Sequence, residues 1–179
     1  LSRAAHLHAE RPALAVGTRV VASYAEFAAR VARLAGGLAA RLAPGDRVGL
    51  VMKNCPAYAE AMFACWHAGL VAVPINAKLH PKELEYILGH SGCRLCFATP
   101  DLHPALAGLA GLGLVEAIET GSAAWDALFA APIEAAERAR GLGAAAGEGI
   151  AAVARVFQHL VGIGAQAEAG ADLAAARDH

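Results

Sequence analysis

The sequence is poor in lysine, serine and threonine and carries almost no excess charge. Its 179 residues include three Lys, four Ser and three Thr, and the formal net charge is −1. Such a chain has no electrostatic basis for binding nucleic acid or an anionic membrane. No uninterrupted apolar run reaches the length of a membrane span, and the first ten residues lack the apolar core of a signal peptide. We therefore predict a cytoplasmic protein with no membrane span and no nucleic-acid partner.

Cysteine is also scarce, and the four present are too few for a disulfide scaffold: Cys55, Cys65, Cys93 and Cys96. Cys93 and Cys96 form a C-x-x-C pair, which suggests either a redox pair or half of a zinc site. A redox pair usually lies at a strand-to-helix turn, whereas these two lie within a predicted strand, where residues three apart point to opposite faces. A zinc site needs a second ligand pair, and none has suitable spacing. We predict reduced thiols buried in the core.

The motifs of common catalytic and nucleotide sites are missing. The eight histidines form no HExxH motif and have no clear carboxylate partner; they are His6, His8, His67, His80, His90, His103, His159 and His179. We interpret His80, beside Pro81, as a helix cap, and we place His67 near a helix C-terminus, where the dipole favours a partly charged imidazole.

The glycine pairs do not complete a nucleotide-binding loop either. They lie at 111 and 113, 141 and 143, and 162 and 164, and none is part of a G-x-G-x-x-G motif after a strand. No lysine follows Lys82 to reach a phosphate from these loops, and no G-x-S-x-G motif is present. We assign no catalytic, cofactor-binding or metal-binding residue.

The stretch from Gly45 to Asn76 is the most informative part of the chain. Apolar runs at 47–52 and 70–75 predict two strands covered on both faces. Pro56 suits the first turn of a helix between them, and Gly69 is placed to end that helix in a left-handed conformation. This pattern predicts a βαβ unit with parallel strands.

Turn and cap signals predict the elements on either side. Before the βαβ unit they predict a hairpin around Gly17-Thr18 and a helix that begins with a capping box of Ser23 and Glu26. The apolar face of that helix is Phe27, Val31, Leu34, Leu38 and Leu42, and Gly36-Gly37 suggests close packing against a neighbour.

After the βαβ unit, a helix from Pro81, a strand at 94–98, a helix capped by Thr99, a strand at 114–118 and a helix capped by Ser122 are expected. Alternating strands and helices from Arg47 to Phe129 predict an α/β domain with a parallel sheet.

The composition changes beyond Pro132. The last 48 residues contain 16 Ala and 7 Gly and no Lys, Ser, Thr, Tyr or Trp. One amphipathic helix fits residues 150–161, and little else in the segment is apolar enough to be buried. We therefore predict a domain at 1–131 followed by an Ala/Gly-rich tail at 132–179, partly helical or disordered.

Five motifs in order resemble the amino-terminal region of the AMP-forming acyl-CoA synthetases, members of the adenylate-forming (AMP-binding) ligase superfamily. The motifs are Tyr24-Ala-Glu-Phe27, Gly45-Asp-Arg-Val48, Asn54-x-Pro56, Ala68-Gly-Leu-Val-Ala-Val-Pro-Ile-Asn76 and Glu83-Leu-Glu-Tyr-Ile-Leu88. The resemblance extends over residues 1–129, and Leu79 to Glu83 is most similar to the acyl-CoA ligase branch. It implies an α/β amino-terminal domain of an enzyme that uses MgATP to activate a fatty or aromatic acid as an acyl-adenylate, which coenzyme A then attacks.

The sequence departs from this family in its nucleotide-binding motifs. The Ser/Thr/Gly-rich phosphate loop ending in Pro-Lys-Gly, the Tyr-Gly-x-Thr-Glu segment, the ribose-binding Asp and the carboxy-terminal catalytic Lys have no match. No catalytic residue is carried over, and we expect the chain alone to be inactive. Because it begins with Leu1 rather than Met, we also expect a fragment, whose partner is the remainder of a ligase or a second copy.

Two alternatives stay open at this point: a non-catalytic α/β module that binds a partner, and a small nucleotide-binding domain. A further hypothesis concerns the tail, whose composition after Ala139 is typical of a frameshifted, GC-rich gene. The other two frames of the coding DNA test this hypothesis. If neither contains a Ser/Thr/Gly-rich loop ending in Pro-Lys-Gly, the hypothesis is wrong.

Overall fold

The computed structural model describes residues 1–111 and 115–130 of the chain. All of these lie in the first of two compact units, Leu1–Gly143. The predicted tail at 132–179 lies outside the described residues, as does its amphipathic helix, and the domain boundary at 131 stays a prediction.

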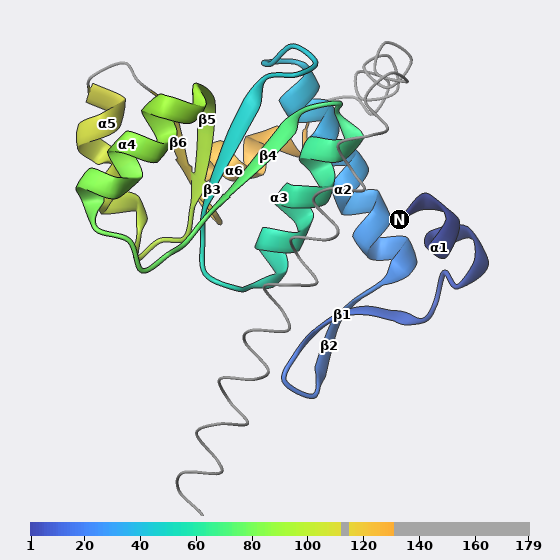
Figure 1. The fold of residues 1–179 in the computed structure, drawn as a ribbon. Helices are drawn as coiled ribbons and strands as arrows, with labels where there is room; N and C mark the ends of the chain where they lie inside the picture. Colours follow the sequence, from blue (N-terminus) through green and yellow to red (C-terminus); the bar gives the residue numbers. More distant parts are fainter. Residues whose placement is uncertain (112–114, 131–179) are drawn as a thin grey trace, which may run out of the picture. The chain divides into compact units, whose positions relative to one another are not determined.

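The centre of the fold is a four-stranded parallel sheet (Figure 1). Its strands, in the spatial order β4-β3-β5-β6, are β3 (Arg47–Val51), β4 (Val71–Ile75), β5 (Cys93–Ala98) and β6 (Glu116–Glu119). All three strand pairs are parallel. The predicted α/β class and βαβ unit are therefore confirmed, and the strand predicted at 114–118 is observed at Glu116–Glu119.

Helices cover both faces of this sheet, and two apolar clusters fill the layers between. The helices are α2 (Tyr24–Ala39), α3 (Pro56–His67), α4 (Pro81–Ser91), the 3-10 helix η1 (His103–Leu106), α5 (Ala107–Gly111) and α6 (Ala123–Leu128). One cluster joins Leu50 and Phe97 to side chains of α2, α3 and α6. The other joins Val51 and Ala98 to side chains of α4 and η1. Burial on both faces explains why the two central strands, β3 and β5, are nearly all apolar rather than alternating.

The two cysteines of the C-x-x-C pair lie on the same side of the sheet, so our expectation of opposite faces is wrong. The pairing of β5 with β3 passes from Cys93 to Leu95 with a register shift, which leaves Arg94 out of the ladder. An extra residue of this kind reverses the alternation of side chains. A Cβ added at Gly49 would lie 3.3 Å from the Cys96 Sγ and 3.6 Å from the Cys93 Sγ. All four cysteines are free thiols; the predicted burial holds for Cys65, Cys93 and Cys96, whereas Cys55 is only half-buried.

The segment after β5 also differs from its prediction. Thr99 does not cap a helix through its side chain; its carbonyl oxygen instead accepts hydrogen bonds from the amides of Leu102 and His103. Helical structure begins only at His103. Because the backbone carbonyl satisfies these amides, the residues Thr99 to Leu102 form a turn.

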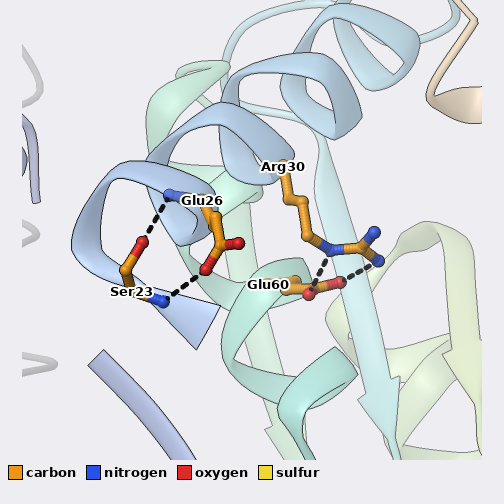
Figure 2. Close-up of polar contacts among 4 residues, drawn as sticks. All are labelled: Ser23, Glu26, Arg30 and Glu60. Atoms are coloured by element: carbon orange, nitrogen blue, oxygen red, sulfur yellow. Dashed lines mark hydrogen bonds and ion pairs between the residues drawn. The ribbon is translucent and has the colours of Figure 1, made fainter. Parts of the chain in front are cut away.

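A hairpin and two helices precede the sheet in the chain. The hairpin consists of β1 (Pro12–Val16) and β2 (Arg19–Ser23), and it follows α1 (Ser2–Leu7), a short helix that the sequence analysis did not predict. The predicted capping box at the start of α2 is present: the amide of Ser23 donates to Glu26 Oε2 at 2.8 Å, and the amide of Glu26 donates to Ser23 Oγ at 3.3 Å (Figure 2).

Close packing explains the glycine pair of α2. A Cβ added at Gly37 would lie 2.1 Å from the carbonyl oxygen of Leu128, at the C-terminus of α6. The predicted close approach is therefore confirmed. Leu42, which we placed on this helix, lies beyond its end at Ala39 but still packs against the same core cluster.

Candidate functional site

The order of the strands indicates at which edge of the sheet a ligand would bind. In a parallel sheet the carboxyl ends of all strands meet at one edge, and ligands bind where successive connections leave in opposite directions. From β3 the chain moves to β4 on one side and then returns to β5 on the other. The switch point therefore lies between the carboxyl ends of β3 and β5.

Lys53, Thr99 and Asp101 lie at this switch point. Lys53 Nζ is 2.7 Å from Asp101 Oδ2, and the side chains are 65% and 46% exposed. The backbone amide of Lys53 donates to Thr99 Oγ1 at 3.5 Å. Hydrogen bonds from Lys53 and then from Thr99 hold the pKa of Asp101 below its ordinary value. The lysine charge is thus already offset by a carboxylate, which a phosphate ligand would have to displace.

The start of α3 lies beside this edge and borders a hollow. Cys55 occupies the N-cap position without a side-chain cap bond, and Pro56 follows in the first turn. Between these residues and the tip of the hairpin is a hollow of about 360 Å³, which we call the hairpin hollow. Its lining residues are Leu14, Ala15, Val16, Gly17, Asn54, Cys55 and Pro56. The lining is mostly aliphatic, with one thiol and one amide.

A histidine–carboxylate pair that the sequence analysis missed lies at the carboxyl end of β6. His103 Nδ1 is 3.4 Å from Glu119 Oε2, and His103 Nε2 is 3.4 Å from the carbonyl oxygen of Ala117. About a third of each side chain is exposed. The two residues are 16 positions apart in the sequence, and nothing local connects them. Only the parallel pairing of β5 with β6 brings the residues that follow β5 to the end of β6.

Among the residues that the structure describes, the most buried charged side chain is a carboxylate that lies between helices rather than in a cleft. Glu60 on α3 is 5% exposed. Arg30 on α2 donates to it through Nε at 2.5 Å and Nη2 at 2.9 Å (Figure 2). This hydrogen bonding raises the pKa of Arg30. The guanidinium also lies over the ring of Phe129, 4.9 Å from its centroid. These contacts join α2, α3 and the end of α6. The pair of Arg30 and Glu60 therefore stabilises the packing of these helices.

Three of the four cysteines are buried thiols, and His80 caps a helix. Burial raises the pKa of the Cys65 and Cys96 thiols to about 12 and raises that of Cys93 as well. A thiol whose pKa is raised by burial is a poor nucleophile, which favours core thiols over a redox pair at Cys93 and Cys96. His80 caps α4 as predicted, since its Nδ1 accepts from the amide of Lys82 at 3.3 Å.

The described residues contain neither a metal-ion site nor a membrane span. Across 1–111 and 115–130, no three His, Cys, Asp or Glu side chains are grouped closely enough to hold a metal ion. None of the helices described is both long enough and apolar enough to cross a membrane. The glycine pairs of the sequence analysis lie wholly or partly outside these residues.

The sequence is similar to one protein family and to named enzymes. The sequence profile of the family described as AMP-binding enzyme matches residues 1–163. A feruloyl-CoA synthase from Amycolatopsis sp is 48% identical over 89 residues, which are 49% of this chain and 18% of that protein. A long-chain-fatty-acid–CoA ligase from Thermus thermophilus is 38% identical over 90 residues, or 50% of this chain and 17% of that protein. The chain thus spans less than a fifth of the length of these relatives.

Solved structures share the fold described above. The N-terminal domain of FACL13 from Mycobacterium tuberculosis aligns with a TM-score of 0.66 and 29% identity, covering 74% of this chain and 35% of that one. A benzoate CoA ligase from Burkholderia xenovorans LB400 aligns with a TM-score of 0.65 and 26% identity, covering 73% of this chain and 27% of that one. The fold is therefore that of the amino-terminal region of acyl-CoA ligases.

Proposed function

Because the chain belongs to the AMP-binding enzyme family, we propose that it is the amino-terminal scaffold of a ligase that joins a fatty or aromatic acid to coenzyme A. The observation that carries this proposal is the 48% identity over 89 residues to a relative named as a feruloyl-CoA synthase. The parallel sheet, which aligns with the N-terminal domain of FACL13, supports the same conclusion. The identity of the acid is left open, because the relatives act on both classes by name.

The proposed reaction has two steps. The acid attacks the α-phosphate of MgATP, which gives an acyl-adenylate and releases pyrophosphate; the thiol of coenzyme A then displaces AMP. The first step needs backbone amides and a cation around the phosphate oxygens, and a Mg²⁺ ion to offset their charge. In the described part of the chain the lysine at the switch point, Lys53, is paired with Asp101. We propose that this pair stabilises the sheet edge, and that the chemistry needs residues outside this chain.

A pyrophosphate-release assay on the full 179-residue chain tests the proposal directly. The assay combines MgATP with ferulate, benzoate and a long-chain fatty acid, one at a time, and the Thermus relative serves as the positive control. We expect no release above the rate without enzyme. Acid-dependent release would contradict the proposed inactivity of the chain and would support the family assignment at the same time.

A second candidate function, binding of a nucleotide phosphate, is favoured by one observation: Lys53 lies at the switch point of a parallel sheet. A ligand that binds only the folded state raises the unfolding temperature. Thermal unfolding with and without MgATP tests this candidate, with the Lys53→Ala variant as the matched control. Stabilisation by MgATP that is lost in the variant would establish a nucleotide site; an unfolding temperature of the parent that does not change on addition of MgATP would exclude it.

The proposed partner of the chain is the remainder of a ligase or a second copy. Light scattering coupled to size-exclusion chromatography distinguishes the two on the purified protein. A dimeric mass would favour the second copy, whereas a monomer that binds a hydrophobic dye would favour a missing partner polypeptide.

A further inference from the structure

We draw no further inference here: the strongest candidate, the hairpin hollow between the tip of β1–β2 and the start of α3, carries none because nothing in the described part of the chain shows what covers its apolar lining.

Discussion

At the scale of single residues, the buried carboxylate of Glu60 depends on one partner. Its two oxygens accept from Arg30, whose side chain is half exposed and also contacts Phe129. A buried charge that loses its partner is strongly destabilising, by about 3–5 kcal/mol when the whole pair is buried. Because water reaches Arg30, we expect the loss of its ion pair with Glu60 to lower the free energy of unfolding by less than this.

We expect Arg30→Met to lower the free energy of unfolding by about 2 kcal/mol, since Glu60 would be left without its guanidinium. Arg33→Met is the matched control, because Arg33 is exposed on the same helix; it should change stability by less than about 0.5 kcal/mol. Urea denaturation measures both. Adding Glu60→Gln to Arg30→Met should restore part of the loss, and equal stability of the two single variants would contradict this account.

Thiol reactivity is a second property of single residues. Cys55 is half-buried, whereas Cys65, Cys93 and Cys96 are buried and their pKa values are raised, those of Cys65 and Cys96 to about 12. A thiol reacts as its thiolate, so at pH 8 these three remain protonated and inaccessible.

We therefore expect Ellman's reagent to modify one cysteine rapidly in the native chain at pH 8 and all four after denaturation. The Cys55→Ser variant should lose the rapid phase and keep the slow reaction of the other three. Rapid modification of Cys93 or Cys96, located by mass spectrometry, would show that β5 opens more easily than its burial implies.

At the scale of elements, the start of α2 depends on its capping box. Ser23 and Glu26 each satisfy an amide of the first turn. The hydrogen bonds from Ser23 hold the pKa of Glu26 below its ordinary value of 4.5. The carboxylate therefore stabilises the folded state above that value, and the contribution is lost as the pH falls through the lowered pKa.

We expect Ser23→Ala to cost about 1 kcal/mol at pH 7, because the amide of Glu26 loses its acceptor. Ser2→Ala is the control, since Ser2 is exposed at the start of α1, which has no side-chain cap bond. Urea denaturation at pH 7 and pH 3 measures both variants. The difference between Ser23→Ala and the parent should largely persist at pH 3, because the lost acceptor, Ser23 Oγ, does not titrate and the amide of residue 23 still donates to Glu26 in the variant; a difference that vanishes at pH 3 would contradict this account.

The contact between α2 and α6 depends on Gly37. A methyl group there would overlap the carbonyl of Leu128, whereas Gly89 in α4 has nothing within 4 Å of an added Cβ. Helical Ala is favoured over Gly by about 1 kcal/mol when space allows, and overpacking costs about 1–3 kcal/mol when it does not.

We expect these two glycine-to-alanine substitutions to act in opposite directions. Gly37→Ala should destabilise the protein because the main chain of α6 must move away, and Gly89→Ala should stabilise it. Thermal unfolding of the two variants, followed by circular dichroism, gives the comparison. Stabilisation by Gly37→Ala would show that α2 and α6 are not in contact in solution.

At the scale of the whole molecule, the described residues form a parallel sheet covered by helices on both faces. At the carboxyl edge of the sheet, Lys53 is paired with Asp101, and His103 lies 3.4 Å from Glu119. The role proposed for this domain is to position other parts of a ligase. Its scaffold role is best tested inside a complete enzyme.

We expect a chimera of the Amycolatopsis relative, with residues 1–130 of this chain in place of its own counterpart, to keep feruloyl-CoA formation within about tenfold of the parent, or about 1.4 kcal/mol. A relative that lacks this region is the negative control. Lys53→Ala in the chimera should leave kcat unchanged, because Lys53 is proposed to stabilise the edge only. A loss of kcat with unchanged thermal stability would place Lys53 in the chemistry.

The sequence by itself determined most of the elements and the family. Apolar runs, Pro56, Gly69 and the capping residues are local signals, so they located the βαβ unit and most of the helix starts. The five ordered motifs likewise needed only sequence spacing. The prediction failed where a backbone group took the role of a side chain, as the carbonyl of Thr99 does in the turn after β5.

Only the tertiary structure decided which distant residues meet. The register shift that leaves Arg94 out of the ladder put Cys93 and Cys96 on one side of the sheet. Strand order brought Lys53 to Asp101 and His103 to Glu119, and helix packing brought Arg30 to Glu60. Spacing along the chain specifies local conformation, whereas these contacts depend on strand order, register and the packing of helices across the sheet, and no local pattern encodes them.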